Sequence, residues 1–134
     1  MTKPVCRLIK MVELVIPGRL PGLNEYTAAC RTHPQAGAKM KKEAEEKVIS
    51  CIIEQRLQGL TASFPVEIEF DWIEKDRRRD PDNISGFGRK VILDALVKTG
   101  VIQDDSGKYI KGFKDCFDVY PLYPRIEVFI KGVR

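Results

Sequence analysis

The chain has 134 residues, and 43% of them are apolar, which suits one domain with a core that needs no disulfide or metal support. The net charge is +4, from 23 basic and 19 acidic residues, a balance that permits nucleic-acid binding without requiring it. The sequence has neither a signal peptide nor a bilayer-length apolar run, so we expect a cytoplasmic protein with no membrane partner. Structural zinc is disfavoured, because the four cysteines form no C-x-x-C pair and His33 is the single histidine.

The N-terminal half predicts one strand and one long helix. Residues 5–16 are rich in β-branched and apolar side chains, and the Pro/Gly-rich turn that follows ends the predicted strand. Residues 24–26, Asn-Glu-Tyr, are predicted to lie in a loop. Residues 36–58 follow helical periodicity, and Gly59 is expected to end that helix. The buried stripe of the helix is predicted to consist of Met40, Ala44, Val48, Cys51, Ile52 and Leu57.

The C-terminal half predicts a strand, a helix and two more strands. Residues 64–73 alternate apolar and acidic side chains, as a half-buried strand does, with Trp72 in the core. Asn83 is expected to cap a helix that ends at Gly100. Two glycines make residues 84–88 a poor helix start, so the helix is expected to become regular near Phe87. Strands are predicted at 109–120 and 125–131. The order predicts a single α+β domain over 1–134, a mixed sheet with two main helices packed on it.

The segment EKDRRRDPDN, residues 74–83, carries the strongest chemical signal. Pro81 disfavours helical geometry at the preceding residue, so Asp80 is expected in extended backbone. In extended chain, Asp80 and Asp82 would point the same way, about 6–7 Å apart, and would repel unless a cation lay between them. Carboxylate oxygens suit Mg²⁺ or Mn²⁺. The adjacent arginines predict an anionic substrate, with phosphodiester as the first candidate; they are Arg77, Arg78 and Arg79.

Two features after this segment each have two interpretations. Asp104 and Asp105 follow the predicted helix, and a return of the chain could bring them toward the first acidic pair. Asp-Asp-Ser-Gly is also ordinary turn chemistry. Lys90 could stabilise charge on a phosphate, or it could form a surface ion pair with Asp94, four residues further along the helix.

Taken together, these motifs resemble the RusA family of Holliday junction resolvases, which is common in prophages. The resemblance covers most of the chain, through IPGRLPGLNEY at 16–26, DRRRDPDN at 76–83 and KVILDALVKTGVIQDD at 90–105. It implies a homodimeric endodeoxyribonuclease that uses one or two Mg²⁺ ions per site, with Mn²⁺ as a substitute, to resolve four-way junctions or other branched DNA in recombination and repair. The metal ligands and catalytic acids implied are Asp80, Asp82 and Asp105, with Asp104 as a neighbouring ligand.

The resemblance also implies roles for basic and polar residues. Lys90 would be the catalytic cation and would contact DNA. The interval from Asn83 to Lys90 is longer than in the founding member of the family, so Arg89 is the alternative catalytic cation. The residues expected to contact the DNA backbone, or to lie near its path, are Arg77, Arg78, Arg79 and Asn24.

A non-catalytic phage DNA-binding protein that retains the fold is the alternative function. The intact set of three aspartates speaks against it. An Asp-x-Asp glycosyltransferase is a third interpretation, but such an enzyme needs a nucleotide-binding domain for which this chain is too short.

Overall fold

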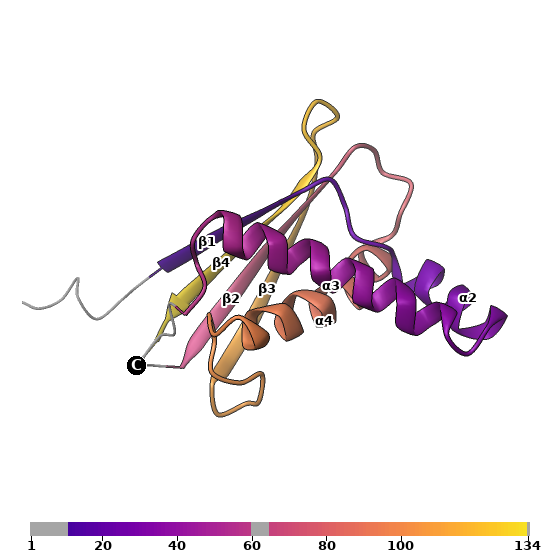
Figure 1. The fold of residues 1–134 in the computed structure, drawn as a ribbon. Coiled ribbons are helices and arrows are strands. Elements are labelled where there is room, and N and C mark those ends of the chain that lie inside the picture. Colours follow the sequence, from indigo (N-terminus) through magenta and orange to yellow (C-terminus); the bar gives the residue numbers. More distant parts are fainter. Residues whose placement is uncertain (1–10, 60–64, 134) are drawn as a thin grey trace, which may run out of the picture.

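The described part of the protein is a four-stranded mixed sheet with two helices over one face and a third helix packed against those two (Figure 1). The structure, a computed structural model, describes residues 11–59 and 65–133. Its elements in chain order are β1 (Met11–Pro17), α2 (Leu23–Thr32), α3 (Ala36–Glu54), β2 (Val66–Glu74), α4 (Pro81–Lys98), β3 (Ile110–Val119) and β4 (Arg125–Gly132). The strand order is β1-β4-β2-β3, in which only the β2–β3 pair is parallel. The α+β class and the mixed sheet are therefore confirmed.

The sheet has one covered face and one open face. Along β2, Ile68, Phe70 and Trp72 are at most 1% exposed, while the acidic residues between them point to the other face. The same alternation runs along β1 and β4. Helices α3 and α4 lie side by side over the covered face, and α2 packs against both (Figure 1). The prediction that Trp72 belongs to the core is confirmed.

Helix α3 ends earlier than the sequence predicts, at Glu54 and not near Gly59. Arg56 takes the left-handed conformation, with φ of 60°, and the Leu57 N–H donates to the Ile52 carbonyl at 3.0 Å, which closes a Schellman motif. A non-glycine residue thus fills the position that sequence rules reserve for glycine. In α4, by contrast, Gly100 occupies this position with φ of 76°, as predicted.

Gln55, just after α3, is bonded to the backbone of the edge strand β1. Its side-chain Nε2 donates to the Val15 carbonyl at 2.7 Å, and its Oε1 accepts from the Val15 N–H at 3.0 Å. One amide side chain therefore satisfies both outward-facing backbone groups of Val15.

The part of the predicted first strand at residues 5–10 lies outside the described residues.

Helix α4 begins at Pro81, with Asp80 as its N-cap, so the predicted cap at Asn83 and regular start near Phe87 are wrong. Proline is well suited to the first helical position, because its fixed φ matches the helix and its missing N–H would be unbonded there. The two glycines that argued for a late start allow close packing instead. A Cβ on Gly86 would lie 3.0 Å from Leu23 Cδ2, and one on Gly88 would lie 3.0 Å from Trp72 Cζ3.

We expect Gly88→Ala to lower the free energy of unfolding by about 1–3 kcal/mol, measured by urea denaturation. The added methyl group would press on the ring of Trp72, which is 1% exposed and has little room to move. Gly107→Ala is the matched control, since a Cβ there meets nothing within 4 Å. Equal unfolding midpoints for the two variants would contradict the close-approach explanation.

Candidate functional site at helix α4

The two motifs IPGRLPGLNEY and DRRRDPDN, which lie 50 residues or more apart in the sequence, are bonded to each other. Asn83 Oδ1, in the first turn of α4, accepts a hydrogen bond from the Asn24 N–H at 2.8 Å. Residues 24–26, predicted as a loop, are in fact in the first turn of α2, and Asn83 caps that helix from outside. Gly22 makes this approach possible, because a Cβ there would lie 2.5 Å from Asn83 Oδ1.

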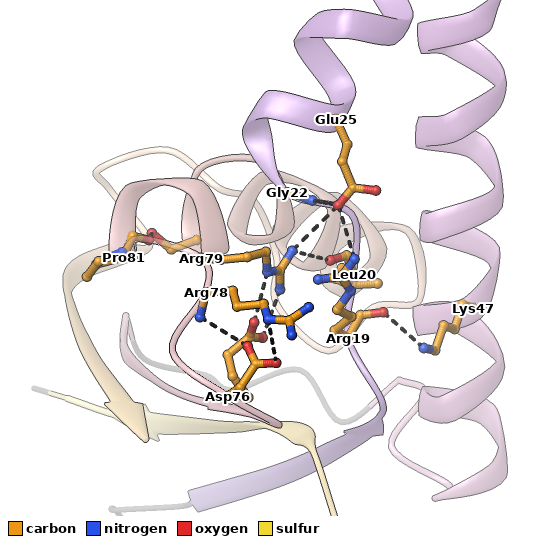
Figure 2. Close-up of polar contacts among 11 residues, drawn as sticks. Arg19, Leu20, Gly22, Glu25, Lys47, Asp76, Arg78, Arg79 and Pro81 are labelled. Carbon is orange, nitrogen blue, oxygen red and sulfur yellow. Dashed lines mark hydrogen bonds and ion pairs between the residues drawn. The ribbon is translucent and has the colours of Figure 1, made fainter. Parts of the chain in front are cut away.

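Arg79 provides a second tie between the same segments (Figure 2). Its guanidinium forms a bidentate pair with Glu74, through two N–H···O bonds of 2.8 Å, and it donates to the Leu20 carbonyl at 3.1 Å. The carboxylate of Glu25 lies 3.8 Å away. The Arg79 side chain is only 10% exposed. Arg79 thus joins the end of β2 to the turn before α2, and its donors are largely used within the protein.

The other two arginines of the run are open to solvent. The Arg78 side chain is 86% exposed, with Nε 3.6 Å from Asp76 Oδ2, and the Arg78 N–H donates to Asp76 Oδ1 at 3.0 Å (Figure 2). Arg77 is also exposed. Of the three arginines predicted to contact DNA, Arg77 and Arg78 are accessible to a phosphate, whereas Arg79 is enclosed by protein groups.

The first acidic pair lies at the N-terminus of α4. Asp80 is extended, with φ of −72° and ψ of 155°, as Pro81 requires. The prediction that Asp82 is also extended is wrong, because it lies in the first helical turn. Both side chains are exposed, and Asp80 lines a cleft of about 170 Å³ beside Arg77. The positive end of the helix dipole favours negative charge at this place.

The second acidic pair returns to α4, but further along the helix. Lys90 Nζ lies 3.4 Å from Asp105 Oδ2 and 3.0 Å from Asp94 Oδ1. The surface ion pair with Asp94, one of the two interpretations of Lys90, is therefore present, and the same lysine also contacts Asp105. Lys90 lies eight residues after Asp82, a rise of about 12 Å along the helix axis. Asp104 is exposed beside Asp105.

A second lysine makes the Asp94 carboxylate the centre of a small network. Lys41 Nζ, from α3, lies 2.8 Å from Asp94 Oδ2. Burial alone would raise the pKa of Asp94, but hydrogen bonds from Lys41 and Lys90 lower it below its usual value. The hydrogen bond to Asp94, with a smaller contribution from Asp105, raises the pKa of Lys90. Lys90 is therefore fully charged at neutral pH.

Arg89, the alternative cation, belongs to a different part of the molecule. Its guanidinium pairs with Asp115 on β3 and lies over the rings of Phe70 and Phe113, at 5.6 and 5.0 Å from their centroids. These partners lie on the covered face of the sheet, so Arg89 joins α4 to the sheet. The geometry favours Lys90 over Arg89 as a cation that acts beside Asp105.

The donor chemistry of the acidic residues fits Mg²⁺, but a complete protein cage is not assembled. The exposed carboxylates provide oxygen ligands only; they are Asp80, Asp82, Asp104 and Asp105. Within residues 11–59 and 65–133, no three Asp, Glu, His or Cys side chains are grouped so that they could bind one metal ion. Mg²⁺ is commonly held by one or two carboxylates and completed by water and substrate phosphates.

Asp71 has an unusual environment that the sequence signalled only weakly. It alternates with core residues along β2 and therefore lies on the open face of the sheet, away from α4. Burial raises the pKa of Asp71 to about 6, with contributions from neighbouring Asp118 and Glu127. Its Oδ1 is buried and has no hydrogen-bond partner among the described residues. As the pH falls through about 6, the folded protein takes up a proton here.

The sequence matches no protein-family model, and a search of curated proteins found no match. Among residues 11–59 and 65–133, the helices are all too short or too polar to cross a bilayer. The candidate functional groups lie on α4 and on the segment 16–26 that is bonded to its first turn.

Proposed function

We propose that this chain is a Mg²⁺-dependent endonuclease that nicks branched DNA, as a RusA-type Holliday junction resolvase does. The observation that carries the proposal is the contact between Lys90 and Asp105. It brings a cation and a carboxylate from the two ends of the motif at 90–105 to one exposed surface of α4, the helix whose N-cap is Asp80 and whose first turn contains Asp82. A binding surface for phosphate needs cations, and a site for Mg²⁺ needs carboxylate oxygens.

The proposal assigns a role to each group. The residues that would hold Mg²⁺ are Asp80, Asp82 and Asp105, with Asp104 beside them. Bound Mg²⁺ would lower the pKa of a water molecule and neutralise phosphate charge. Lys90 would stabilise negative charge on the phosphate in the transition state. Arg77 and Arg78, which are accessible, would hold the DNA backbone, and the exposed Asn24 at the start of α2 would lie along the DNA path.

The substrate suggests a symmetric dimer. A four-way junction is close to two-fold symmetric, and resolving it needs two nicks, which a homodimer supplies from two sites related by one axis. The cytoplasm is the proposed location, and the free thiols of Cys30, Cys51 and Cys116 fit a reducing compartment.

One observation favours the alternative of a DNA-binding protein without activity: the carboxylates do not form a three-ligand group in the described residues. Nicking of a synthetic four-way junction, with linear duplex of the same sequence as control, separates the two functions. We expect nicks at symmetric positions in Mg²⁺, none in EDTA, and little cleavage of the duplex. Junction binding without nicks in either Mg²⁺ or Mn²⁺ would establish the alternative.

We expect Lys90→Ala to slow single-turnover nicking by roughly a hundredfold or more, because it removes a preorganised cation at the reacting phosphate. Junction affinity should change only a few-fold. Lys42→Ala removes an exposed lysine from α3 and is the matched control. A nicking rate for Lys90→Ala within a few-fold of the control would mean that Lys90 serves only its ion pairs with Asp94 and Asp105.

Arg77→Ala and Arg78→Ala should each weaken junction binding to a similar extent on junctions of different sequence, since phosphates carry no sequence information. The slope of log affinity against log salt should become shallower by about 0.9 for each phosphate contact that is lost. Titrations at several salt concentrations measure this slope. A slope equal to that of the unmodified protein would place these arginines outside the DNA interface.

A further inference from the structure

A small cavity opens directly beside Lys90, between α2 and α4. Its volume is about 280 Å³, which is at the small end for a ligand site and suits one ring system better than a larger molecule. Three apolar side chains and two lysines line it together with a glycine; they are Leu23, Tyr26, Phe87, Lys41, Lys90 and Gly86. The cavity thus combines an aromatic and aliphatic wall with two lysines, whose charges are partly balanced by Asp94 and Asp105.

The apolar wall is preformed and partly open to solvent. The Tyr26 ring stacks on Phe87, with centroids 4.4 Å apart and an angle of 22° between the planes. Phe87 is only 4% exposed and anchors this pair in the core, whereas Leu23 remains 39% exposed. Gly86 lets Leu23 come close to α4, because a Cβ there would lie 3.0 Å from Leu23 Cδ2. A flat ring can therefore find apolar contacts here without rearranging the fold.

The two lysines are held in place and remain accessible. Asp94 accepts from both, and it keeps Lys41 Nζ and Lys90 Nζ within 2.8 and 3.0 Å of its two oxygens. The side chains of Lys41 and Lys90 are 35% and 58% exposed, so an anion can reach them. An apolar slot with cations beside it complements a nucleotide, whose flat base carries a phosphate on its sugar.

We infer that this cavity takes one unstacked base of the DNA, next to the phosphate held at Lys90. The inference rests on the proposed function and specifies how such an enzyme would select its substrate. A base inside an intact duplex must be unstacked and unpaired before it can enter, whereas bases at a branch point are more easily released. The protein would then prefer branched DNA because a duplex must spend the free energy of unstacking and unpairing a base before that base can fill the pocket.

The test uses four-way junctions that carry 2-aminopurine at the branch point, and linear duplexes with the same base in the middle, both in EDTA so that the strands stay intact. Binding of the unmodified protein should change the fluorescence of the junction and leave that of the duplex nearly constant. Leu23→Ala should weaken junction binding at least about fivefold and reduce the fluorescence change. Leu122→Ala, at a position 86% exposed and outside the cavity lining, is the matched control and should behave as the unmodified protein.

The outcomes separate this inference from the proposed nuclease. If the junction is bound without a fluorescence change, or if Leu23→Ala and Leu122→Ala behave alike, the base site is refuted even when nicking in Mg²⁺ is normal. If the fluorescence change depends on Leu23 and no nicking occurs in Mg²⁺ or Mn²⁺, the base site stands and the nuclease proposal fails. Absence of DNA binding would refute both. Since Leu23 is exposed, loss of folding in its alanine variant is not expected, and circular dichroism checks this directly.

Discussion

Asp82→Asn is expected to abolish nicking of a four-way junction in Mg²⁺ while junction binding is retained. Asparagine keeps the shape of the side chain and removes its charge, so a ligand for a hard cation is lost with little change in packing. Asp82 is exposed in the first turn of α4 and its replacement leaves the core untouched. Binding depends mainly on neutralising phosphates, and it can tighten slightly when a nearby negative charge is removed.

The measurement compares nicking rates and junction affinities for Asp82→Asn and Glu67→Gln. Glu67 is an exposed acid on the open face of the sheet, and its replacement should leave both quantities unchanged. Near-normal nicking by Asp82→Asn would remove this residue from the set of metal ligands. A parallel loss of nicking and binding would point to a role in holding DNA instead.

Arg79→Ala should be the most destabilising substitution in the arginine run, lowering the free energy of unfolding by about 3–5 kcal/mol. It would leave Glu74, which is 7% exposed, as a buried charge without its bidentate partner. It would also remove the donor to the Leu20 carbonyl, and with it a tie between β2 and the segment before α2.

Urea denaturation of Arg79→Ala and Arg78→Ala compares the free energies of unfolding of the two variants. The Arg78 side chain is 86% exposed, and its removal should change stability by no more than about 0.5 kcal/mol. Replacing Arg79 and Glu74 together by apolar residues of similar volume should recover much of the loss, because no charge is then left buried. Equal stabilities for the two single variants would show that the ion pair between Arg79 and Glu74 does not stabilise the fold.

The regular part of the fold was largely predictable. Periodicity identified α3, β2, β3, β4 and the end of β1 within a few residues, because half-buried strands and amphipathic helices impose their own spacing on apolar side chains. Helix α2 was not predicted. It has no buried residue, and Asn83, far away in the sequence, bonds one of its first N–H groups. The local signal is limited to Glu25, whose Oε1 accepts from the Gly22 N–H at 3.1 Å. The start of α4 was misplaced because local propensity penalises Gly86 and Gly88, whereas their purpose is close packing.

The candidate site was predictable in part. The resemblance to the RusA family, not spacing alone, pointed to Lys90 and Asp105, and the structure brings these two side chains into contact. The sequence could not show which of the three adjacent arginines is enclosed and which are exposed. The difference depends only on which one pairs with Glu74 at the end of β2. The cavity beside Lys90 was not visible either, because it needs α2, α3 and α4 together. Such differences arise from contacts between distant segments, which composition and periodicity do not encode.

The amide of Gln55 has a consequence for how copies of this chain can associate. An edge strand with free N–H and C=O groups is a template on which a second chain can extend the sheet. At Val15 both groups are already bonded to Gln55, so a continuous intermolecular sheet through β1 would first have to displace that side chain. A second copy that binds without such displacement must use another surface. Replacing Gln55 would therefore leave the N–H and C=O groups of Val15 free to pair with a strand of another molecule, and so favour aggregation.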